Sequence, residues 1–338
     1  MKKRRIVGLF VLCCICFSLS AQQTFRIMEY NVENLFDCRH DSLKQDYEFL
    51  PDSPKGWSMN RYQDKLNKIA KVILAASHEQ VPDLVGLCEV ENEYCLDGLT
   101  QYSPLRDAGY RYIMTNSPDE RGVDVALLYQ PATFSHISTQ CIGIPYKEIK
   151  RRPTRDILHV TGRVVSGDTL DVFVCHMPSR SGGEVKSEPY RLFTARFLKE
   201  AADSVMGVRQ NPHVVIMGDF NDYPSNRSLT EVLGAVKPGK KVKKYTLYNL
   251  MDGKEGGTYR YRGEWGTLDQ MIVNGMMLQK KSRIRTSYND AQILTFPFLL
   301  EEDDRYGGDT PFRTYFGKKY HGGYSDHLPV AVDLYIKE

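Results

Sequence analysis

The sequence predicts an α/β or mixed α+β sheet protein, because apolar segments typical of buried strands alternate with segments that repeat at the helical period. Of the 338 residues, 41% are hydrophobic and 26% are charged, which is the composition of a globular chain with a sizeable core. These values exclude collagenous, disordered and polytopic membrane proteins. No internal repeat or low-complexity linker is present, so residues 22–338 are predicted to form a single domain.

The individual elements follow from hydrophobic spacing. Short apolar runs bounded by polar turns predict strands over residues 24–30, 83–90, 123–129, 157–165, 170–175, 213–217, 268–273 and 328–336. Apolar residues at helical spacing predict a helix over residues 61–77. Its buried face is expected to carry Leu66, Ile69, Ala70, Ile73 and Leu74.

A second helix is predicted over residues 189–205, with Pro189 near its first turn, where proline is tolerated. Its periodic positions are Leu192, Ala195, Arg196 and Lys199. Residues 299–323 are polar, glycine-rich and aromatic, and they predict a long surface loop. Loops of that length are often functional.

Residues 1–21 have the pattern of a secretory signal peptide. A basic segment at residues 2–5 precedes an apolar run at residues 6–19, which is short for a membrane-spanning helix. Cleavage after Ser20 and cleavage after Ala21 both stay open. Lipid anchoring through Cys13, Cys14 or Cys16 is the less favoured alternative, because none of them follows a Gly, Ala or Ser. We therefore expect export to the periplasm or the extracellular space.

Loss of this segment changes the charge balance. The whole chain has a formal net charge of +3, and removing the four basic residues of the segment turns it into −1, so the trimmed chain has no global basic field for nucleic acid. Five cysteines remain, and an odd number argues against a disulfide framework. Cys88 and Cys175 lie in apolar runs and are expected to be buried. One bridge, between Cys88 and Cys95 or with Cys38, stays open.

Polar and acidic residues stand where the predicted strands begin or end. These positions are Asn31, Glu89, His176, Asp219 with Asn221, Asp269, and Asp326 with His327. Catalytic groups usually converge at strand edges, and a carboxylate beside apolar residues must be solvated, paired or bound to metal. Taken singly, each has a structural interpretation as a surface charge, a turn residue, a packed histidine or a cap. Six such sites in one chain favour catalysis.

The order of these residues resembles the endonuclease/exonuclease/phosphatase superfamily, which includes pancreatic-type deoxyribonucleases, repair exonucleases, sphingomyelinases and inositol polyphosphate phosphatases. The most specific parts are the Gly-Asp-Phe-Asn box at residues 218–221 and the Ser-Asp-His-Leu-Pro box at residues 325–329. The resemblance spans residues 25–336, and residues 31–37 and 121–129 are most similar to the exported bacterial branch. It implies a four-layer α/β sandwich of the deoxyribonuclease I type, in which helices flank two packed mixed β-sheets and the site lies at one end.

The resemblance also implies a divalent metal ion, usually Mg²⁺, with Mn²⁺ or Ca²⁺ as alternatives. Glu89 would be the principal ligand, helped by Asn31 and Asp326, and such oxygen ligands suit Mg²⁺. Arg180 is a candidate for a bidentate contact to the substrate phosphate, with a solvated loop arginine as the alternative.

In the implied mechanism, water attacks phosphorus in line. His327 is the base or the electrostatic partner of the phosphate, and Asp269 holds its tautomer. Asp219 orients or deprotonates the water, and Asn221 donates to a phosphoryl oxygen. His176 donates to the phosphate or protonates the leaving oxygen.

The expected activity is a secreted metal-dependent phosphoesterase, with a nuclease-like phosphodiesterase favoured. Nucleic acid is the favoured partner, since the basic residues at 151–155 and 237–244 would contact phosphates, and no protein partner is inferred. The aromatic residues of the predicted loop would either stack on bases or pack the loop down. The alternatives are a sphingomyelinase-like lipid phosphodiesterase with residues 296–300 at the membrane, a small phosphomonoesterase, and a binding module on the same scaffold.

Overall fold

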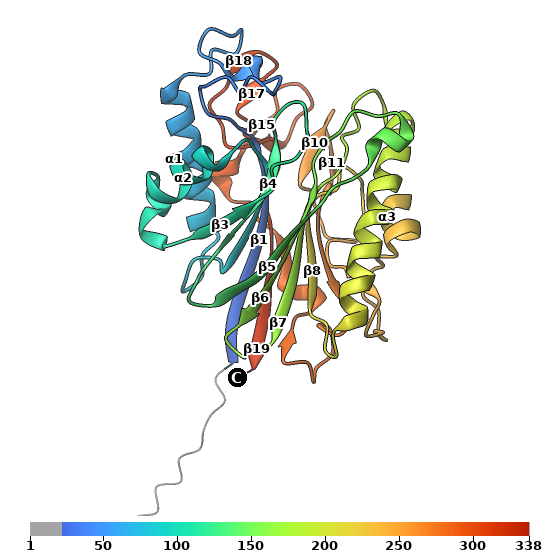
Figure 1. Cartoon of the computed structure of the whole chain (residues 1–338). Coiled ribbons are helices and arrows are strands. Elements are labelled where there is room, and N and C mark those ends of the chain that lie inside the picture. The colour runs from blue at the N-terminus through green and yellow to red at the C-terminus, as the bar shows by residue number, and fades with distance from the viewer. Residues whose placement is uncertain (1–21, 338) are drawn as a thin grey trace, which may run out of the picture.

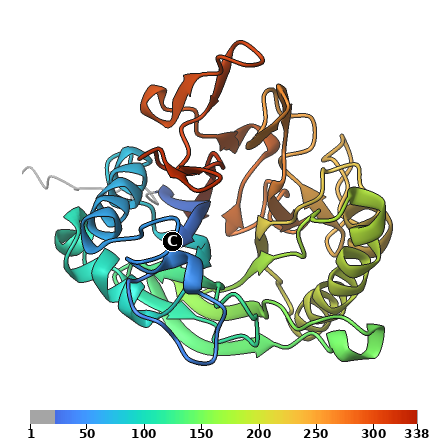
Figure 2. The ribbon, with the colours of Figure 1, turned by 90° about the horizontal axis from the view of Figure 1, so that it is seen from above.

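A computed structural model of the chain describes residues 22–337, and the predicted signal peptide lies outside the described residues. Two β-sheets pack face to face, and helices cover the outer face of each sheet (Figure 1; Figure 2). The four-layer α/β sandwich predicted from the sequence is confirmed.

The first sheet is built around a long strand from the start of the described chain. Its strands are β1 (Gln22–Leu35), β2 (Leu84–Val90), β3 (Arg111–Met114), β4 (Asp124–Tyr129), β13 (Ile284–Arg285), β14 (Ala291–Ile293) and β19 (Val330–Lys337). They pair in the order β13-β19-β1-β2-β4-β3, and β14 also pairs with β19. The pair β1–β2 is parallel and the pair β1–β19 is antiparallel, so the sheet is mixed.

The second sheet is also mixed. Its strands are β5 (Phe134–Ile142), β6 (Ile157–Val164), β7 (Thr169–His176), β8 (Val214–Asp219), β9 (Leu247–Asn249) and β12 (Asp269–Asn274). They pair in the order β5-β6-β7-β8-β12-β9. Only the β7–β8 pair in this sheet is parallel.

Helices α1 (Met59–Ala75) and α2 (Glu93–Gln101) cover the first sheet, and α3 (Glu184–Val208) covers the second (Figure 1). Single 3₁₀ or π-helical turns occur at Tyr47–Phe49, Pro104–Ala108, Tyr146–Ile149, Ser228–Leu233, Tyr288–Asp290 and Pro297–Leu299. Small hairpins pair β10 (Tyr259–Tyr261) with β11 (Glu264–Gly266), β15 (Leu300–Glu302) with β16 (Asp309–Pro311), and β17 (Tyr315–Phe316) with β18 (Lys319–Tyr320). Between residues 22 and 337, no helix combines the length and apolarity that crossing a bilayer requires.

Three layers of apolar side chains hold the sandwich together. One lies between the first sheet and its helices, the second between the two sheets, and the third between the second sheet and α3. Along β1, Met28 and Tyr30 belong to the first layer, whereas Phe25 and Ile27 belong to the second, because successive strand side chains point to opposite faces. A strand buried on both faces carries a continuous apolar run, which is why such runs predicted the strands.

Helix α1 confirms the helix predicted over residues 61–77, although it begins and ends two residues earlier and one residue of the predicted face is exposed. It begins after Ser58, whose hydroxyl accepts a hydrogen bond from the amide of Arg61. Its buried residues include Leu66, Ile69, Ala70 and Ile73. Leu74 is exposed instead, because the buried stripe turns toward Val72 near the end of the helix.

Helix α3 differs from the prediction in length and in orientation. Pro189 lies inside the helix rather than at its start, and Arg196, predicted at a periodic position, is exposed. The buried face instead carries Ser187, Arg191, Thr194, Ala195, Leu198, Ala202 and Met206. This orientation has an electrostatic cause, because Nε of Arg191 lies 2.7 Å from Oδ1 of Asp222 and both side chains are buried.

Residues 299–323, predicted as a loop, contain the hairpins β15–β16 and β17–β18. The aromatic residues there divide into two groups. Tyr315 is buried and its ring centroid lies 6.1 Å from that of Trp57, so it packs the segment onto the core. Tyr306 and Phe316 are exposed. The packing interpretation therefore applies to Tyr315, and stacking on bases stays a prediction for the exposed members of the group.

All five cysteines of the described residues are free. Cys88 and Cys175 are buried, as predicted. Cys88 lies in the layer between the sheets and Cys95 in the layer beneath α1 and α2, so a bridge between them is excluded.

Strand direction brings the predicted site residues of the first sheet together. In the parallel pair β1–β2, Asn31 lies opposite Cys88, so Glu89 follows at the same end of the sheet. Strand β19 runs antiparallel to β1, and its first residue Val330 lies near that end. The segment that precedes β19 carries His327 there as well.

In the second sheet, Asp219 is the shared neighbour of two other site residues. It pairs with His176 across the parallel β7–β8 ladder and with Asp269 across the antiparallel β8–β12 ladder. Gly218, directly before it, has a φ of +142°, and a Cβ atom there would lie 1.8 Å from the carbonyl oxygen of Cys175. Only glycine permits this close approach of β7 and β8.

We expect Gly218→Ala to lower the free energy of unfolding by at least about 3 kcal/mol, because the added methyl group imposes backbone strain and a clash with a neighbouring strand. The matched control is Gly167→Ala, where φ is +82° but no atom lies within 4 Å of the new Cβ. That change should cost only about 1–2 kcal/mol. Urea unfolding of both variants measures the difference, and equal losses would contradict the assigned role of Gly218.

Candidate active site

A cavity of about 820 Å³ opens at the end of the sandwich where these strand ends meet. Every predicted site residue except Asp269 lines it, namely Asn31, Glu89, His176, Arg180, Asp219, Asn221, Asp326 and His327. Asp269 is fully buried and contacts His327 from behind. The structure therefore brings together residues that lie almost 300 positions apart in the chain.

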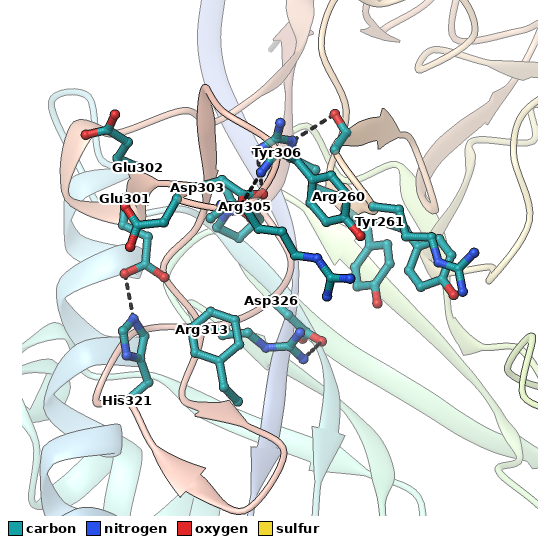
Figure 3. A pocket seen from close by; sticks show the side chains of 17 residues that line it. Arg260, Tyr261, Glu301, Glu302, Asp303, Arg305, Tyr306, Arg313, His321 and Asp326 are labelled. Carbon is teal, nitrogen blue, oxygen red and sulfur yellow. Dashed lines mark hydrogen bonds and ion pairs between the residues drawn. The ribbon is translucent and has the colours of Figure 1, made fainter.

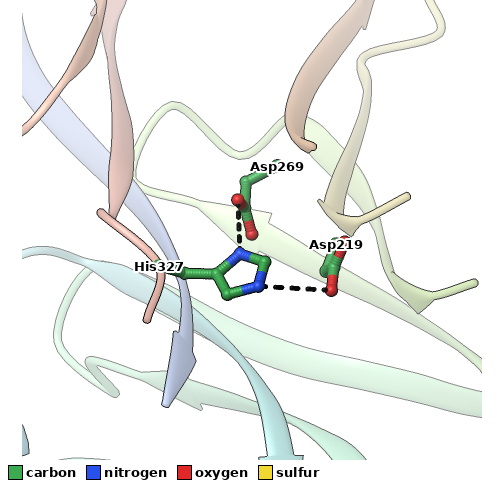
Figure 4. Close-up of side chains that lie close together, drawn as sticks. All are labelled: Asp219, Asp269 and His327. Carbon is green, nitrogen blue, oxygen red and sulfur yellow. Dashed lines mark hydrogen bonds and ion pairs between the residues drawn. The ribbon is translucent and has the colours of Figure 1, made fainter. Parts of the chain in front are cut away.

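His327 lies between two buried carboxylates (Figure 4). Its Nδ1 atom is 2.8 Å from Oδ2 of Asp269, and its Nε2 atom is 3.9 Å from Oδ2 of Asp219. The hydrogen bond to Asp269 fixes the orientation of the ring and places a proton on Nδ1. The Nε2 edge is then the part of the ring that faces Asp219 and the cavity.

Burial and charge set the protonation of this group. Burial on its own would lower the pKa of His327, but the carboxylates of Asp269 and Asp219 outweigh it and raise that pKa well above its ordinary value. Burial raises the pKa of Asp219 to about 7, although the His327 charge opposes the rise. The site thus holds an imidazolium beside a carboxyl group that titrates near neutral pH, as acid–base sites do.

Asp219, Asp269 and His327 also satisfy a distance criterion for metal binding, since their ligand atoms lie within 4.8 Å of one another. A histidine that ligates a metal must offer a free lone pair, and a protonated imidazole has none. Nδ1 of His327 already donates to Asp269, so only Nε2 of the deprotonated ring could ligate a metal ion at this cluster.

Glu89 offers a second, separate carboxylate to the cavity. Its Oε2 atom accepts a hydrogen bond of 3.0 Å from the amide of Asn34, while Oε1 lies 3.8 Å from Nε2 of His176 and 3.7 Å from Nη2 of Arg121. The φ angles of Glu89 and Asn34 are +68° and +60°, in a region that residues with side chains rarely adopt. Strain of this kind is concentrated at functional sites. Carboxylate and amide oxygens here fit a hard divalent cation.

Two amide side chains hold Asp219 in place. Nδ2 of Asn31 and Nδ2 of Asn221 each donate to Oδ2 of Asp219 at 3.1 Å, and the backbone amide of Asn221 donates to Oδ1 at 2.8 Å. Asn221 also donates to the carbonyl oxygen of Met177 at 3.2 Å. In this arrangement Asn221 positions the carboxylate, and its predicted contact to a phosphoryl oxygen stays a prediction.

His176 is a neutral imidazole at the floor of the cavity. Burial lowers its pKa well below the ordinary value, and the nearby positive charges of Arg155, Arg121 and His327 lower it further. Its Nε2 atom lies 3.5 Å from Oδ2 of Asp219, and its Nδ1 atom has no hydrogen-bond partner within the described residues. A neutral ring in this position can donate one hydrogen bond, as the predicted role requires.

Asp326 is bound by Arg313, which is not among the site residues predicted from the sequence. Nη2 of Arg313 lies 2.7 Å from Oδ2 of Asp326, and its Nε lies 3.5 Å from Oε1 of the buried Glu33. Glu33 in turn accepts a hydrogen bond of 2.6 Å from the amide of Thr314. This chain of contacts connects the segment before β19 to the end of β1.

Two arginines at the cavity make contacts that the sequence does not indicate. Arg180 donates through Nε to the carbonyl oxygen of Asn221 at 2.8 Å and through Nη2 to Oδ1 of Asn226 at 2.8 Å, so it secures the segment that carries Asn221. Its predicted phosphate contact stays a prediction. Arg121 is not predicted as a site residue, yet it lines the cavity beside Glu89 with 52% of its side chain exposed.

The lysine-rich segment 237–244 lies away from the cavity. The carbonyl oxygen of Lys244 accepts a hydrogen bond from Asn274, the last residue of β12, whereas Asp269 is the first. A strand of this length spans roughly 17 Å. Among the other basic candidates, Arg155 is buried against Asp119 at 3.2 Å. No residue of either basic segment lines the cavity, so any phosphate contact they make would lie outside it.

Comparison with known proteins identifies relatives of this arrangement. Residues 26–336 match the Endonuclease/Exonuclease/phosphatase family. A solved structure of a Bacteroides thetaiotaomicron protein of that family is 16% identical, with a TM-score of 0.61, and the match covers 94% of this chain and 99% of that chain. A Bacteroides thetaiotaomicron mannosyl-6-phosphatase is 16% identical, with a TM-score of 0.57 and coverage of 92% and 99%.

The structure of D. rerio TDP2 complexed with a single strand DNA product is 13% identical, with a TM-score of 0.56 and coverage of 92% and 98%. At these identities the likeness of the solved structures shows a shared fold. Comparison with curated protein sequences gave no match.

Replacing Asp269 by Asn keeps the shape of the side chain but removes the charge that favours protonated His327. We expect the pKa of His327 to fall, so that the ring loses its proton at a lower pH, and kcat to fall about 10²–10⁴-fold. NMR titration of the histidine signals in chelator measures the first effect, and initial rates measure the second. The control is Asp333→Asn, which removes a carboxylate 2.9 Å from Arg26 outside the cavity. An unchanged His327 pKa in Asp269→Asn would contradict the assigned interaction.

Proposed function

The chain belongs to the endonuclease/exonuclease/phosphatase family, and from this premise we propose that it is a divalent-metal-dependent, nuclease-like phosphodiesterase. Family membership makes the chain a phosphoesterase, and the metal and the substrate are the proposed parts. The observation that carries the proposal is the position of His327 between Asp269 and Asp219, in a cavity that Glu89 also lines.

The side chains divide the work of in-line attack by water. Asp219 orients the water and takes its proton, since its pKa of about 7 leaves a useful fraction ionised at neutral pH. His327, already protonated, stabilises the negative charge that builds on the phosphoryl oxygens. Asp269 keeps that ring oriented. His176 donates a hydrogen bond to the phosphate or to the leaving oxygen.

Glu89, Asn31 and Asp326 would hold Mg²⁺, with Mn²⁺ or Ca²⁺ as alternatives. The bound ion would supply positive charge to the phosphoryl and leaving-group oxygens. Support comes from the Glu89 carboxylate, which the Asn34 amide holds by Oε2 so that Oε1 lies toward His176 and Arg121 at the cavity.

A single-stranded nucleic acid or a short phosphodiester is the favoured substrate. One structural relative, D. rerio TDP2, is described in complex with a single strand DNA product. A small phosphomonoester is the second candidate, because the lysine-rich segment lies away from the cavity and cannot follow a long nucleic-acid backbone there. The mannosyl-6-phosphatase among the relatives supports the same candidate.

The lipid alternative receives less support. The rings of Phe296 and Phe298 stack with centroids 5.4 Å apart and pack against the core beneath α1, so residues 296–300 do not protrude as a membrane loop.

Export is a further part of the proposal, and its support is the basic, apolar and small residues of segment 1–21. Mass spectrometry of the protein purified from its native cell should find a mature N-terminus at Ala21 or Gln22. A lipid on Cys13, Cys14 or Cys16 would support anchoring instead, and an intact Met1 would contradict cleavage.

Glu89→Gln tests the metal proposal directly. With Mg²⁺, we expect the wild-type chain to hydrolyse single-stranded DNA and small phosphodiesters, and chelator to abolish this turnover. The variant should lose at least about a hundredfold in kcat, because it lacks the principal ligand charge near the phosphate. Its circular dichroism spectrum should be unchanged.

The matched control for this test is Glu79→Gln, an exposed glutamate outside the cavity, which should keep full activity. Wild-type turnover that persists in chelator, or equal turnover of Glu89→Gln and wild type, would contradict metal-dependent catalysis at Glu89.

A further inference from the structure

A second cavity, of about 480 Å³, adjoins the catalytic cavity (Figure 3). Tyr259, Tyr261 and Asp326 line both cavities, so the two form one continuous surface. Tyr259 stands at the junction, since its ring centroid lies 5.0 Å from that of His327. A substrate with its phosphate at His327 would therefore extend into the second cavity along Tyr259.

The walls of the second cavity are held in place by the protein itself. Strand β10 and the turn that follows it form one wall, and the hairpin β15–β16 with its connecting turn forms another. Arg260 joins them, with Nη1 at 3.0 Å from Oδ2 of Asp303 and Nη2 at 2.6 Å from the carbonyl oxygen of Gly307. Both side chains of the ion pair are largely buried. The space between the hairpins is thus preformed.

Three aromatic rings are exposed along this surface without serving the core. The exposed fractions are 57% for Tyr261, 45% for Tyr306 and 49% for Phe316. An arginine lies over each ring. The distance from the guanidinium carbon to the ring centroid is 5.2 Å for Arg262 over Tyr261, 5.1 Å for Arg305 over Tyr306 and 5.7 Å for Arg313 over Phe316. Exposed aromatic rings and guanidinium planes in a concave site provide stacking surfaces for flat or cyclic ligands.

The charge of the cavity argues against a second phosphate group there. Five carboxylates and four arginines line it, so it has no excess of positive charge. Arg260 and Arg313 are paired with Asp303 and Asp326, and the remaining members are Arg262, Arg305, Glu301, Glu302 and Asp304. Such carboxylates repel an anion but accept hydrogen bonds from hydroxyl or amino groups. An uncharged ring that carries such groups fits both the stacking surfaces and the acceptors.

We propose that the second cavity binds the ring-bearing alcohol portion of the phosphoester, a nucleoside or a sugar, while the phosphate lies in the catalytic cavity. This inference rests on the proposed function and specifies the substrate class for the same site. Small esters without a ring would be hydrolysed but would not use the second cavity.

The test compares three phosphodiesters that share one ring-free leaving group, 2,2,2-trifluoroethanol, in Mg²⁺, with its release followed by fluorine NMR. Their retained groups are methyl, thymidine through its 5′ oxygen, and a methyl hexoside through its 6 oxygen. The corresponding phosphomonoesters are assayed in parallel by phosphate release. For Tyr306→Ala, we expect KM for a ring-bearing ester to rise about tenfold more than KM for the methyl ester, with little change in the kcat ratio. Arg305→Ala should act in the same direction.

The matched control is Tyr245→Ala. Tyr245 is also exposed, with Nζ of Lys244 5.0 Å from its ring centroid, but it lies in the lysine-rich segment away from both cavities. The Tyr245→Ala variant should have the same KM as the wild type for every ester. If Tyr306→Ala raises KM only for the thymidine ester, the ligand is a nucleoside, and if it raises KM only for the hexoside ester, the ligand is a sugar. Either result supports the proposal.

If Tyr306→Ala changes KM equally for ring-bearing and methyl esters, or changes neither, the proposed subsite is wrong. In that case, wild-type turnover of the methyl esters would still support the proposed function. Absence of turnover with every ester in the wild type would contradict the proposed function, and the subsite assignment with it.

Discussion

Two carboxylates, Asp219 and Asp269, lie buried as direct partners at the end of the second sheet. Removing two like charges from water is costly unless an opposite charge and hydrogen bonds compensate. The imidazolium of His327 and the amides of Asn31 and Asn221 provide that compensation. Asn31 comes from the first sheet and His327 from the segment that enters it, so the charge balance of the site depends on the packing of the two sheets.

The charges of Asp219 and Asp269 also affect the protonation of a third buried carboxyl group. Glu29 on β1 is fully buried, and its pKa is raised well above the ordinary value, first by burial and then by Asp269 and Asp219. A neutral carboxyl is tolerated in the core between the sheets, where a third negative charge is not. The thiol of Cys88 contacts its Oε1 at 3.6 Å, so these two polar groups share one place in an otherwise apolar layer. The charges of Asp219 and Asp269 thus restrict the chemistry of the neighbouring core.

The sequence predicts the buried strands, and the common location of the proposed site residues, because both depend on local pattern. Strands buried on two faces appear as apolar runs, and a polar residue at the end of such a run, such as Asn31 or Asp219, marks the edge where a site forms. Contacts between distant segments leave no such pattern. The burial of Arg191 depends on Asp222, which lies in the segment after β8, and this pairing turns α3 away from its predicted face. Similarly, the hydrogen bond from Asn274 to the carbonyl oxygen of Lys244 secures the end of segment 237–244, and the charge of the segment does not indicate it.

The two ends of the described chain lie side by side, since Gln22 pairs with Lys337 in the first sheet (Figure 1). From that pair β1 runs to Asn31 at the cavity, a length of roughly 30 Å. A molecule attached to a solid support through either terminus would therefore hold its cavity on the side away from the support. Immobilised enzyme would keep open access for dissolved substrates, and the direction of attachment would be the same for both termini.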